Sequence, residues 1–96
     1  MEKKVQLKHP QRKKAVSMNQ EKYDLLKQAV LKHLGARRNA TFTDLVKGIE
    51  TEFKRERTKF QGSLAWHLEW VKLDLEARRI IKRVGATSPQ EYTLAR

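Results

Sequence analysis

The residues best suited to binding a ligand are cationic and hydrogen-bonding side chains that lie together in one short stretch of the sequence. Lys and Arg crowd the stretch 54–59, and Gln, Ser and His follow within the next eight positions. Lys and Arg hold phosphate groups, whereas Gln and Ser can exchange hydrogen bonds with base edges. The chemistry indicated is recognition of a phosphodiester chain. The residues for phosphate are Lys54, Arg55 and Arg57, and those for base edges are Lys59, Gln61, Ser63 and His67.

Further cations flank this stretch on both sides. The chain has 22 Lys and Arg against 11 Asp and Glu, a net charge of +11, and its first 20 residues hold six basic residues and one acidic residue. Such an excess favours anionic partners, although a basic segment can equally be a solubilising tail or a solvated face. The cations that could reach neighbouring phosphates are Arg78, Arg79, Lys82 and Arg83, and further along a duplex Lys8, Arg12, Lys13 and Lys14.

Motifs for catalysis or metal binding are absent from the sequence. There is no cysteine, and His9, His33 and His67 are too scattered to suggest a metal site. The four glycines form no phosphate-binding loop, and no HExxH pair occurs. His67 and Glu69 are two apart, which places them on different faces of a helix. We therefore expect no enzyme, no metal, no cofactor and no small-molecule substrate.

The length and hydropathy of the chain narrow its class. Its 96 residues are enough for one modest core. No apolar run approaches the roughly 20 residues of a membrane span, and the charged N-terminus has no apolar block behind it. We expect a cytoplasmic protein that does not enter a membrane. Residues 1–18 form a basic arm or a loose hairpin, because Val5 with Leu7 and Val16 with Met18 alternate as strand faces do.

Two helices are predicted in the first half of residues 19–96. Ser17 with Gln20 resembles a capping box, and apolar residues then recur every three or four positions as far as Gly35, a good helix stop. Residues 36–39 make a polar connection, and Thr41 with Asp44 offers a second capping box. The predicted apolar faces are Tyr23, Leu26, Val30 and Leu34 in the first helix, and Leu45, Val46, Ile49 and Phe53 in the second.

The third predicted helix, residues 61–79, has two apolar faces. Leu64, Leu68, Val71 and Leu75 form one stripe, and Trp66, Trp70, Leu73 and Ala77 fall opposite. A three-helix core buries only one of these stripes. The second would be covered by the N-terminal segment, through Val5, Leu7 and Val16, or by a second copy of the chain, because tryptophan is enriched at interfaces. We therefore name Trp66, Trp70 and Leu73 as a candidate interface.

The period of the sequence changes from helical to alternating after Arg79. Ile80, Lys82 and Val84 would face one way, residues 85–89 provide a turn, and EYTLA returns. Three helices followed by a C-terminal β-hairpin is the order of a winged helix-turn-helix fold, mainly α with a small antiparallel sheet. We expect this domain over residues 19–96.

Three stretches of the sequence resemble one family of proteins. They are LKHP near the start, EKYDLL with AVL in the first helix, and W…VKLDLEARRIIKRV in the third. Together they resemble a family of small bacterial winged-helix domains of uncharacterised function, over almost the whole chain. The resemblance implies the fold and assigns no reaction.

The expected function follows from the fold and the charges. In helix-turn-helix proteins the second helix of the motif enters the major groove and flanking cations hold phosphates. We expect a winged-helix protein that binds duplex DNA mainly through phosphate, as an accessory transcriptional regulator would. The alternative is a non-enzymatic module for homodimerisation or a protein partner through Trp66, Trp70 and Leu73.

Overall fold

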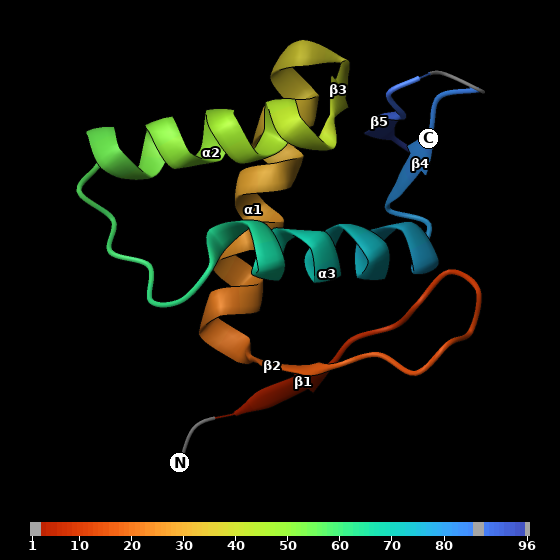
Figure 1. The fold of residues 1–96 in the computed structure, drawn as a ribbon, viewed down its shortest axis with the longest axis horizontal. Coiled ribbons are helices and arrows are strands. Elements are labelled where there is room, and N and C mark those ends of the chain that lie inside the picture. Colours follow the sequence, from red (N-terminus) through yellow and green to blue (C-terminus); the bar gives the residue numbers. More distant parts are fainter. Residues whose placement is uncertain (1–2, 86–87, 96) are drawn as a thin grey trace.

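The computed structural model describes residues 3–85 and 88–95. In chain order the elements are β1 (Lys4–Gln6), β2 (Ser17–Asn19), α1 (Gln20–Arg37), β3 (Asn39–Thr41), α2 (Phe42–Arg55), α3 (Leu64–Ala77), β4 (Ile81–Arg83) and β5 (Glu91–Leu94). Figure 1 shows α2 and α3 side by side across one face, with α1 behind them. The β1–β2 hairpin lies beyond one side of α3, and the C-terminal strands lie at the far end of the helices.

Helix α1 is longer than the sequence predicted, and its N-terminal cap is a different residue. The Asn19 side chain accepts a hydrogen bond from the Lys22 amide at 3.1 Å, so the predicted Ser17–Gln20 capping box is wrong. Ser17 belongs to β2 instead. The helix also runs through Gly35 to Arg37, because isolated glycine is tolerated in a helix and Arg38, at φ +65°, takes the left-handed position at its end.

Helix α2 begins where the sequence predicted. The Thr41 hydroxyl accepts a hydrogen bond from the Asp44 amide at 3.1 Å, and the Asp44 carboxylate accepts one from the Thr41 amide at 3.2 Å. These hydrogen bonds lower the pKa of Asp44. Gly48 gives α1 room, since a Cβ there would lie 2.5 Å from the His33 ring.

Helix α3 confirms the first of the two predicted stripes. It begins at Leu64 rather than residue 61 and ends at Ala77 rather than residue 79. Leu68, Val71 and Leu75 are fully buried against α1 and α2. The second stripe divides, because Trp70 packs against the edge of the core whereas Trp66 remains 48% exposed.

The predicted wing is confirmed and gains a strand that the sequence did not indicate. β4 and β5 pair antiparallel with Lys82 opposite Thr93. The polar connection after α1 supplies β3, which pairs with the other edge of β5, so the strand order is β3-β5-β4. Three helices with this sheet form the winged-helix fold that we expected. Of the predicted turn at 85–89, residues 86–87 lie outside the described residues.

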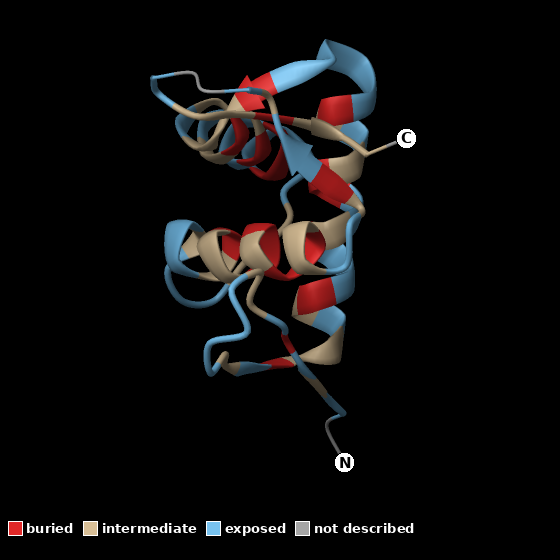
Figure 2. Cartoon of the chain, turned by 90° about the vertical axis from the view of Figure 1, so that its right-hand side faces the viewer, coloured by how far each residue is buried: buried red, intermediate tan, exposed pale blue. Residues whose placement is uncertain are grey.

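The N-terminal hairpin shares the core of the helices. β1 and β2 pair with Val5 opposite Met18, and Leu7 and Met18 are only 2% and 4% exposed. Both belong to the same hydrophobic cluster as the buried residues of all three helices. Figure 2 shows these buried segments on the inward sides of the elements. Within the described part of the chain, no helix is long and apolar enough to cross a membrane.

Candidate nucleic-acid interface

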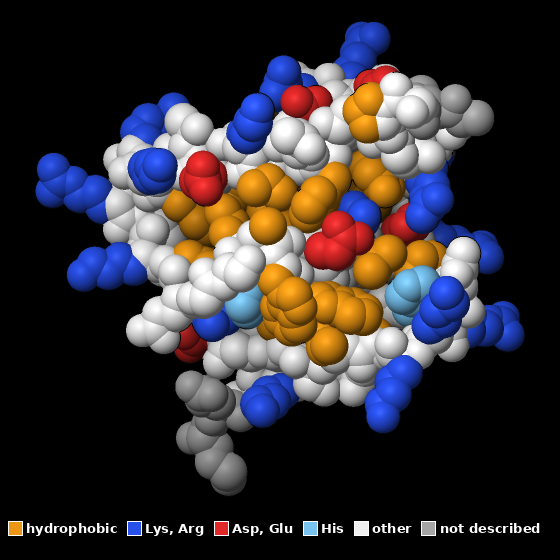
Figure 3. Space-filling model, viewed as in Figure 1, with side chains coloured by type: hydrophobic (Ala, Val, Ile, Leu, Met, Phe, Trp, Pro, Cys, Tyr) orange, Lys and Arg blue, Asp and Glu red, His pale blue; other side chains and the backbone are white. Residues whose placement is uncertain are grey.

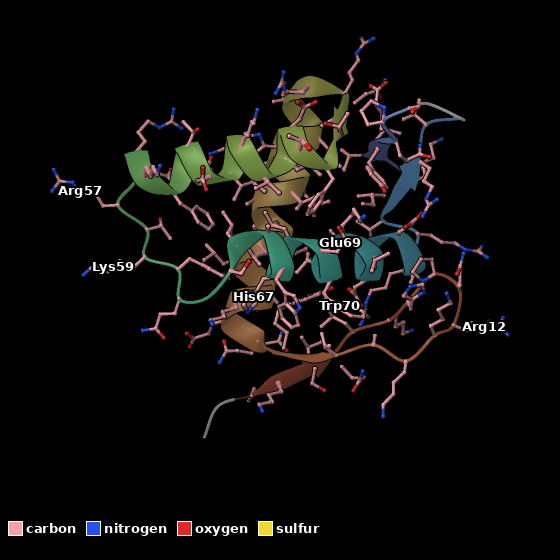
Figure 4. The ribbon with its side chains drawn as sticks, in the orientation of Figure 1. Arg12, Arg57, Lys59, His67, Glu69 and Trp70 are labelled. Carbon is pink, nitrogen blue, oxygen red and sulfur yellow. The ribbon has the colours of Figure 1, made fainter. Side chains whose placement is uncertain are left out.

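The end of α2 and the turn that follows it hold four of the cations predicted to contact nucleic acid. We call Lys54, Arg55, Arg57 and Lys59 the turn cluster; all four are exposed. Figure 4 shows Arg57 and Lys59 projecting away from the protein. None of the four forms an ion pair with another described residue. Their charges are therefore available to a ligand.

The backbone of the turn cluster is fixed by the way α2 ends. Thr58 donates its amide to the Phe53 carbonyl at 2.8 Å, and Arg57 donates its amide to the Lys54 carbonyl at 3.2 Å. This pair of bonds is the Schellman motif, in which glycine usually holds the left-handed position. Here Arg57 holds it, with φ +56°.

Of the residues predicted to approach base edges, Lys59 belongs to the turn cluster, and the other three have hydrogen-bond partners within the protein. The Ser63 hydroxyl accepts a hydrogen bond from the Trp66 amide at 3.1 Å and so caps α3. The His67 Nδ1 donates to the Ser63 carbonyl at 2.7 Å. The Gln61 carbonyl accepts a hydrogen bond from Lys22 Nζ at 3.0 Å, while its side chain is exposed. Ser63 and His67 thus position the start of α3.

Five rings form a continuous row from α2 to the outer side of α3. Phe60 lies 6.4 Å from Phe53 and 4.9 Å from His67, and Trp66 lies 4.9 Å from His67 and 6.4 Å from Trp70, all between ring centroids. We call these five residues the aromatic row. Figure 4 shows His67 and Trp70 on the side of α3 that faces the N-terminal hairpin. Trp66 is its most exposed member, and Leu73 is half-buried further along α3.

Helix α3 presents no cation to solvent. Its one lysine, Lys72, is 7% exposed and pairs with Glu69 at 2.8 Å. The Lys72 ammonium also lies 5.0 Å from the Phe42 ring centroid and 5.2 Å from that of Tyr92, so two cation–π contacts hold it inside. Glu69 is left on the outer side. A helix with this surface is poorly suited to reading bases between phosphate chains.

A buried carboxylate that the sequence analysis missed anchors the other end of α3. Asp74 is fully buried and accepts hydrogen bonds from the Lys8 amide at 2.8 Å, from Arg78 Nε at 2.9 and 3.0 Å, and from the Tyr23 hydroxyl. Burial and the bond to Asp74 raise the pKa of Tyr23 well above its usual value. We call Asp74, Tyr23, Arg78 and the Lys8 amide the Asp74 hub. It joins the three stretches on which the family resemblance rests.

The cations predicted after α3 divide into paired and unpaired groups. Arg78 is held by Asp74, and Arg83 Nε pairs with Glu76 Oε1 at 2.5 Å, which raises the pKa of both guanidinium groups. Arg79 and Lys82 are exposed, and neither has an ion-pair partner among the described residues. The structure therefore leaves half of this set free for an external anion.

The predicted N-terminal cations gather beside the C-terminal end of α3. Lys8, Arg12, Lys13 and Lys14 lie in or next to the loop that joins β1 to β2, and with Arg79 they line one cleft. Figure 3 shows hydrophobic side chains along the middle of the face formed by α2 and α3, with Lys and Arg around its edge. The site residues therefore form two basic regions separated by the aromatic row and Glu69.

The fold and these surfaces define a small winged-helix domain in which two groups of the predicted site cations lie near the two ends of α3. The described residues contain no group of His, Asp and Glu that could hold a metal ion. A family model, that of the family of unknown function DUF6958, matches residues 4–92, so the chain belongs to that family. No curated protein and no solved structure matches the chain.

Proposed function

We propose that the protein is a non-enzymatic winged-helix domain that binds duplex DNA through phosphate contacts, in the manner of an accessory regulator. The observation that carries the proposal is the turn cluster, four exposed cations without ion-pair partners in the described structure. Arg binds phosphate oxygens through its planar fork of donors, and Lys binds them as a point charge. Lys82, which is exposed, extends the contact toward the wing.

The proposed mode of binding has little sequence preference. The outer side of α3 carries Trp66 and Glu69 where a base-reading helix would carry exposed donors. Ser63 and His67 form hydrogen bonds at the start of α3, which leaves the exposed side chains of Lys59 and Gln61 for base contact. Phosphate contacts fix position without reading sequence.

Salt dependence tests this function directly. We expect fluorescence anisotropy with a random duplex to give an affinity that falls with salt, with a log-log slope of about −0.9 for each phosphate contact. The variant R57Q/K59Q should bind more weakly and with a shallower slope. Its matched control is R37Q/K47Q, which removes the same charge from α1 and α2 outside the two basic regions. Equal losses in both variants, or no binding at low salt, would refute the proposal.

A second function is favoured by the exposed end of the aromatic row. Trp66 is 48% exposed although its ring is held edge-to-face against both His67 and Trp70. Large aromatic side chains in such positions are typical of protein interfaces. In this reading the domain self-associates or docks on a protein partner through Trp66, Trp70 and Leu73. Light scattering at increasing concentration tests self-association, and Trp66→Ala should abolish any growth in mass while leaving duplex affinity unchanged.

A further inference from the structure

The cleft between the N-terminal loop and the end of α3 has the composition of an anion site. Its volume is about 730 Å³. Glu76 is the carboxylate among the lining residues, and its charge is already paired with Arg83. None of the lining cations forms an ion pair with a described residue. We call this the loop cleft, and its five cations are Lys8, Arg12, Lys13, Lys14 and Arg79.

Hydrogen bonds fix the backbone that forms the walls of the loop cleft. The Lys8 amide donates to the buried Asp74 carboxylate at 2.8 Å, and the Leu7 amide donates to the Val16 carbonyl at 3.1 Å. The loop itself turns through hydrogen bonds to His9, whose carbonyl accepts from the Arg12 amide and whose Nδ1 accepts from the Gln11 amide. The cations are therefore attached to a preorganised backbone, which lowers the entropy cost of binding.

Two arginines of the loop cleft have a positive φ, a backbone conformation that is unfavourable for any residue with a Cβ atom. Arg12 has φ +60° and Arg79 has φ +62°. Arg79 occupies the left-handed position of a second Schellman motif, since Ile80 donates to the Leu75 carbonyl at 2.8 Å and Arg79 to the Glu76 carbonyl at 3.1 Å. Glycine would be less strained there. Substitution of Arg79 by glycine would therefore remove the guanidinium without adding backbone strain, which gives a direct test of its role in binding.

We propose that the loop cleft binds a phosphorylated ligand of nucleotide size. Arg and Lys side chains would hold the phosphate, and the volume, which falls within the range of about 300–1,000 Å³ typical of small-ligand sites, exceeds what a bare phosphate fills. The same chemistry is offered by a free nucleoside monophosphate and by the phosphorylated end of a nucleic-acid strand.

This inference goes beyond duplex binding, because the turn cluster lies at the opposite end of α3 and takes no part in it. Figure 4 shows the separation, with Arg57 and Lys59 at one end and Arg12 at the other. A failure of the duplex proposal would leave the loop cleft untouched. Conversely, loss of the cleft site would leave the turn cluster able to hold phosphates.

The test is a calorimetric titration of the full chain with four probes: adenosine, adenosine 5′-monophosphate, and a trinucleotide with and without a 5′-phosphate. We expect each phosphorylated probe to bind about tenfold or more tightly than its unphosphorylated counterpart, because the charge-assisted bonds require the phosphate. Equal affinity of the monophosphate and the phosphorylated trinucleotide identifies a free nucleotide as the ligand. Tighter binding of the trinucleotide identifies a strand end. Absence of any phosphate dependence would overturn the proposal.

A pair of glycine variants separates binding from folding. Arg79→Gly removes the guanidinium and relieves the positive φ, so the melting temperature should stay the same or rise while affinity for the monophosphate falls about tenfold. Arg57→Gly makes the same change in the equivalent motif of α2, outside the cleft, and should leave monophosphate affinity unchanged. Equal losses of monophosphate affinity in the two variants would show that only the overall charge matters, and would refute the site. Arg79→Lys should retain part of the affinity.

Discussion

Cations without ion-pair partners among the described residues lie near both ends of α3, but the two ends of the helix are held in place by different kinds of interaction. The C-terminal end is fixed by the Asp74 hub, whose buried carboxylate reaches α1 and the N-terminal segment. The N-terminal end is fixed by the Ser63 cap and by the edge-to-face contact between the half-buried rings of Phe60 and His67. The C-terminal end therefore lines a cleft with a fixed backbone, whereas the N-terminal end follows an exposed turn. The difference indicates a shaped ligand at the first and an extended polyanion at the second.

The largest effect should come from removing the buried anchor. Asp74→Ala leaves the Tyr23 hydroxyl, the Lys8 amide and the part-exposed Arg78 guanidinium without their acceptor, and each buried donor left unpaired costs about 1–3 kcal/mol. Urea unfolding followed by circular dichroism measures the loss. Asp24→Ala, which removes an exposed carboxylate from α1, is the control and should change stability by less than about 0.5 kcal/mol. A small effect at Asp74 would mean that the two ends are anchored alike.

The contribution of the Tyr23 hydroxyl to stability, and its dependence on pH, test the same anchor. Tyr23→Phe removes a hydrogen bond to a charged group, and we expect a loss of about 1.5–3 kcal/mol at neutral pH. Because the folded state raises the pKa of Tyr23, its contribution is complete below the unfolded pKa near 10 and declines as the pH rises above that value. The difference between wild type and Tyr23→Phe in urea unfolding should therefore narrow above pH 10. A difference that stays constant would contradict this assignment.

The anchor at the N-terminal end should be weaker. Ser63→Ala removes the side-chain cap of α3 and should cost about 1 kcal/mol. Thr41→Ala at the start of α2 is the matched comparison, because Thr41 makes the corresponding bond in its capping box. Thermal unfolding of the two variants gives the comparison. A cost at Ser63 as large as that at Asp74 would remove the distinction between the two ends.

The smallest effect on stability should come from the strained turn. Arg57→Gly relieves a positive φ but loosens the unfolded chain, so the net gain should be about 0.5 kcal/mol. The same variant should lower the magnitude of the duplex salt slope by about 0.9 if Arg57 holds one phosphate. Unfolding and anisotropy on the same sample measure both quantities. A gain in stability with an unchanged salt slope would show that Arg57 does not contact the duplex.

The helices were predictable because their signals are local. Leu68, Val71 and Leu75 recur at helical spacing, and all three are buried as predicted. The capping box at Thr41 and Asp44 is also contained within four residues. By contrast, β3 has three residues, and its partner β5 lies some fifty positions later, so no nearby pattern indicated the pairing. Propensity could not distinguish this strand from a polar connection.

The site was less predictable because charge compensation depends on tertiary contacts. Arg78 and Arg83 resemble free cations in the sequence, yet Asp74 and Glu76 hold them. A signal for the Asp74 hub did exist, since Asp74 follows the apolar Val71 by three residues and precedes Arg78 by four. The loop cleft had no such signal, because it joins residues 6–15 to residues 76–79.

The strand order β3-β5-β4 has a consequence for synthesis on the ribosome. The central strand of the sheet is the last one in the described chain, so β3 and β4 both emerge before their common partner. Synthesis adds about 5–20 residues per second, so the helices emerge before the last strand. The helices can assemble during this time, but the sheet must wait for residues 91–94 to leave the exit tunnel. Tyr92 then brings the second ring to Lys72, so that lysine is fully enclosed only after β5 has joined the sheet.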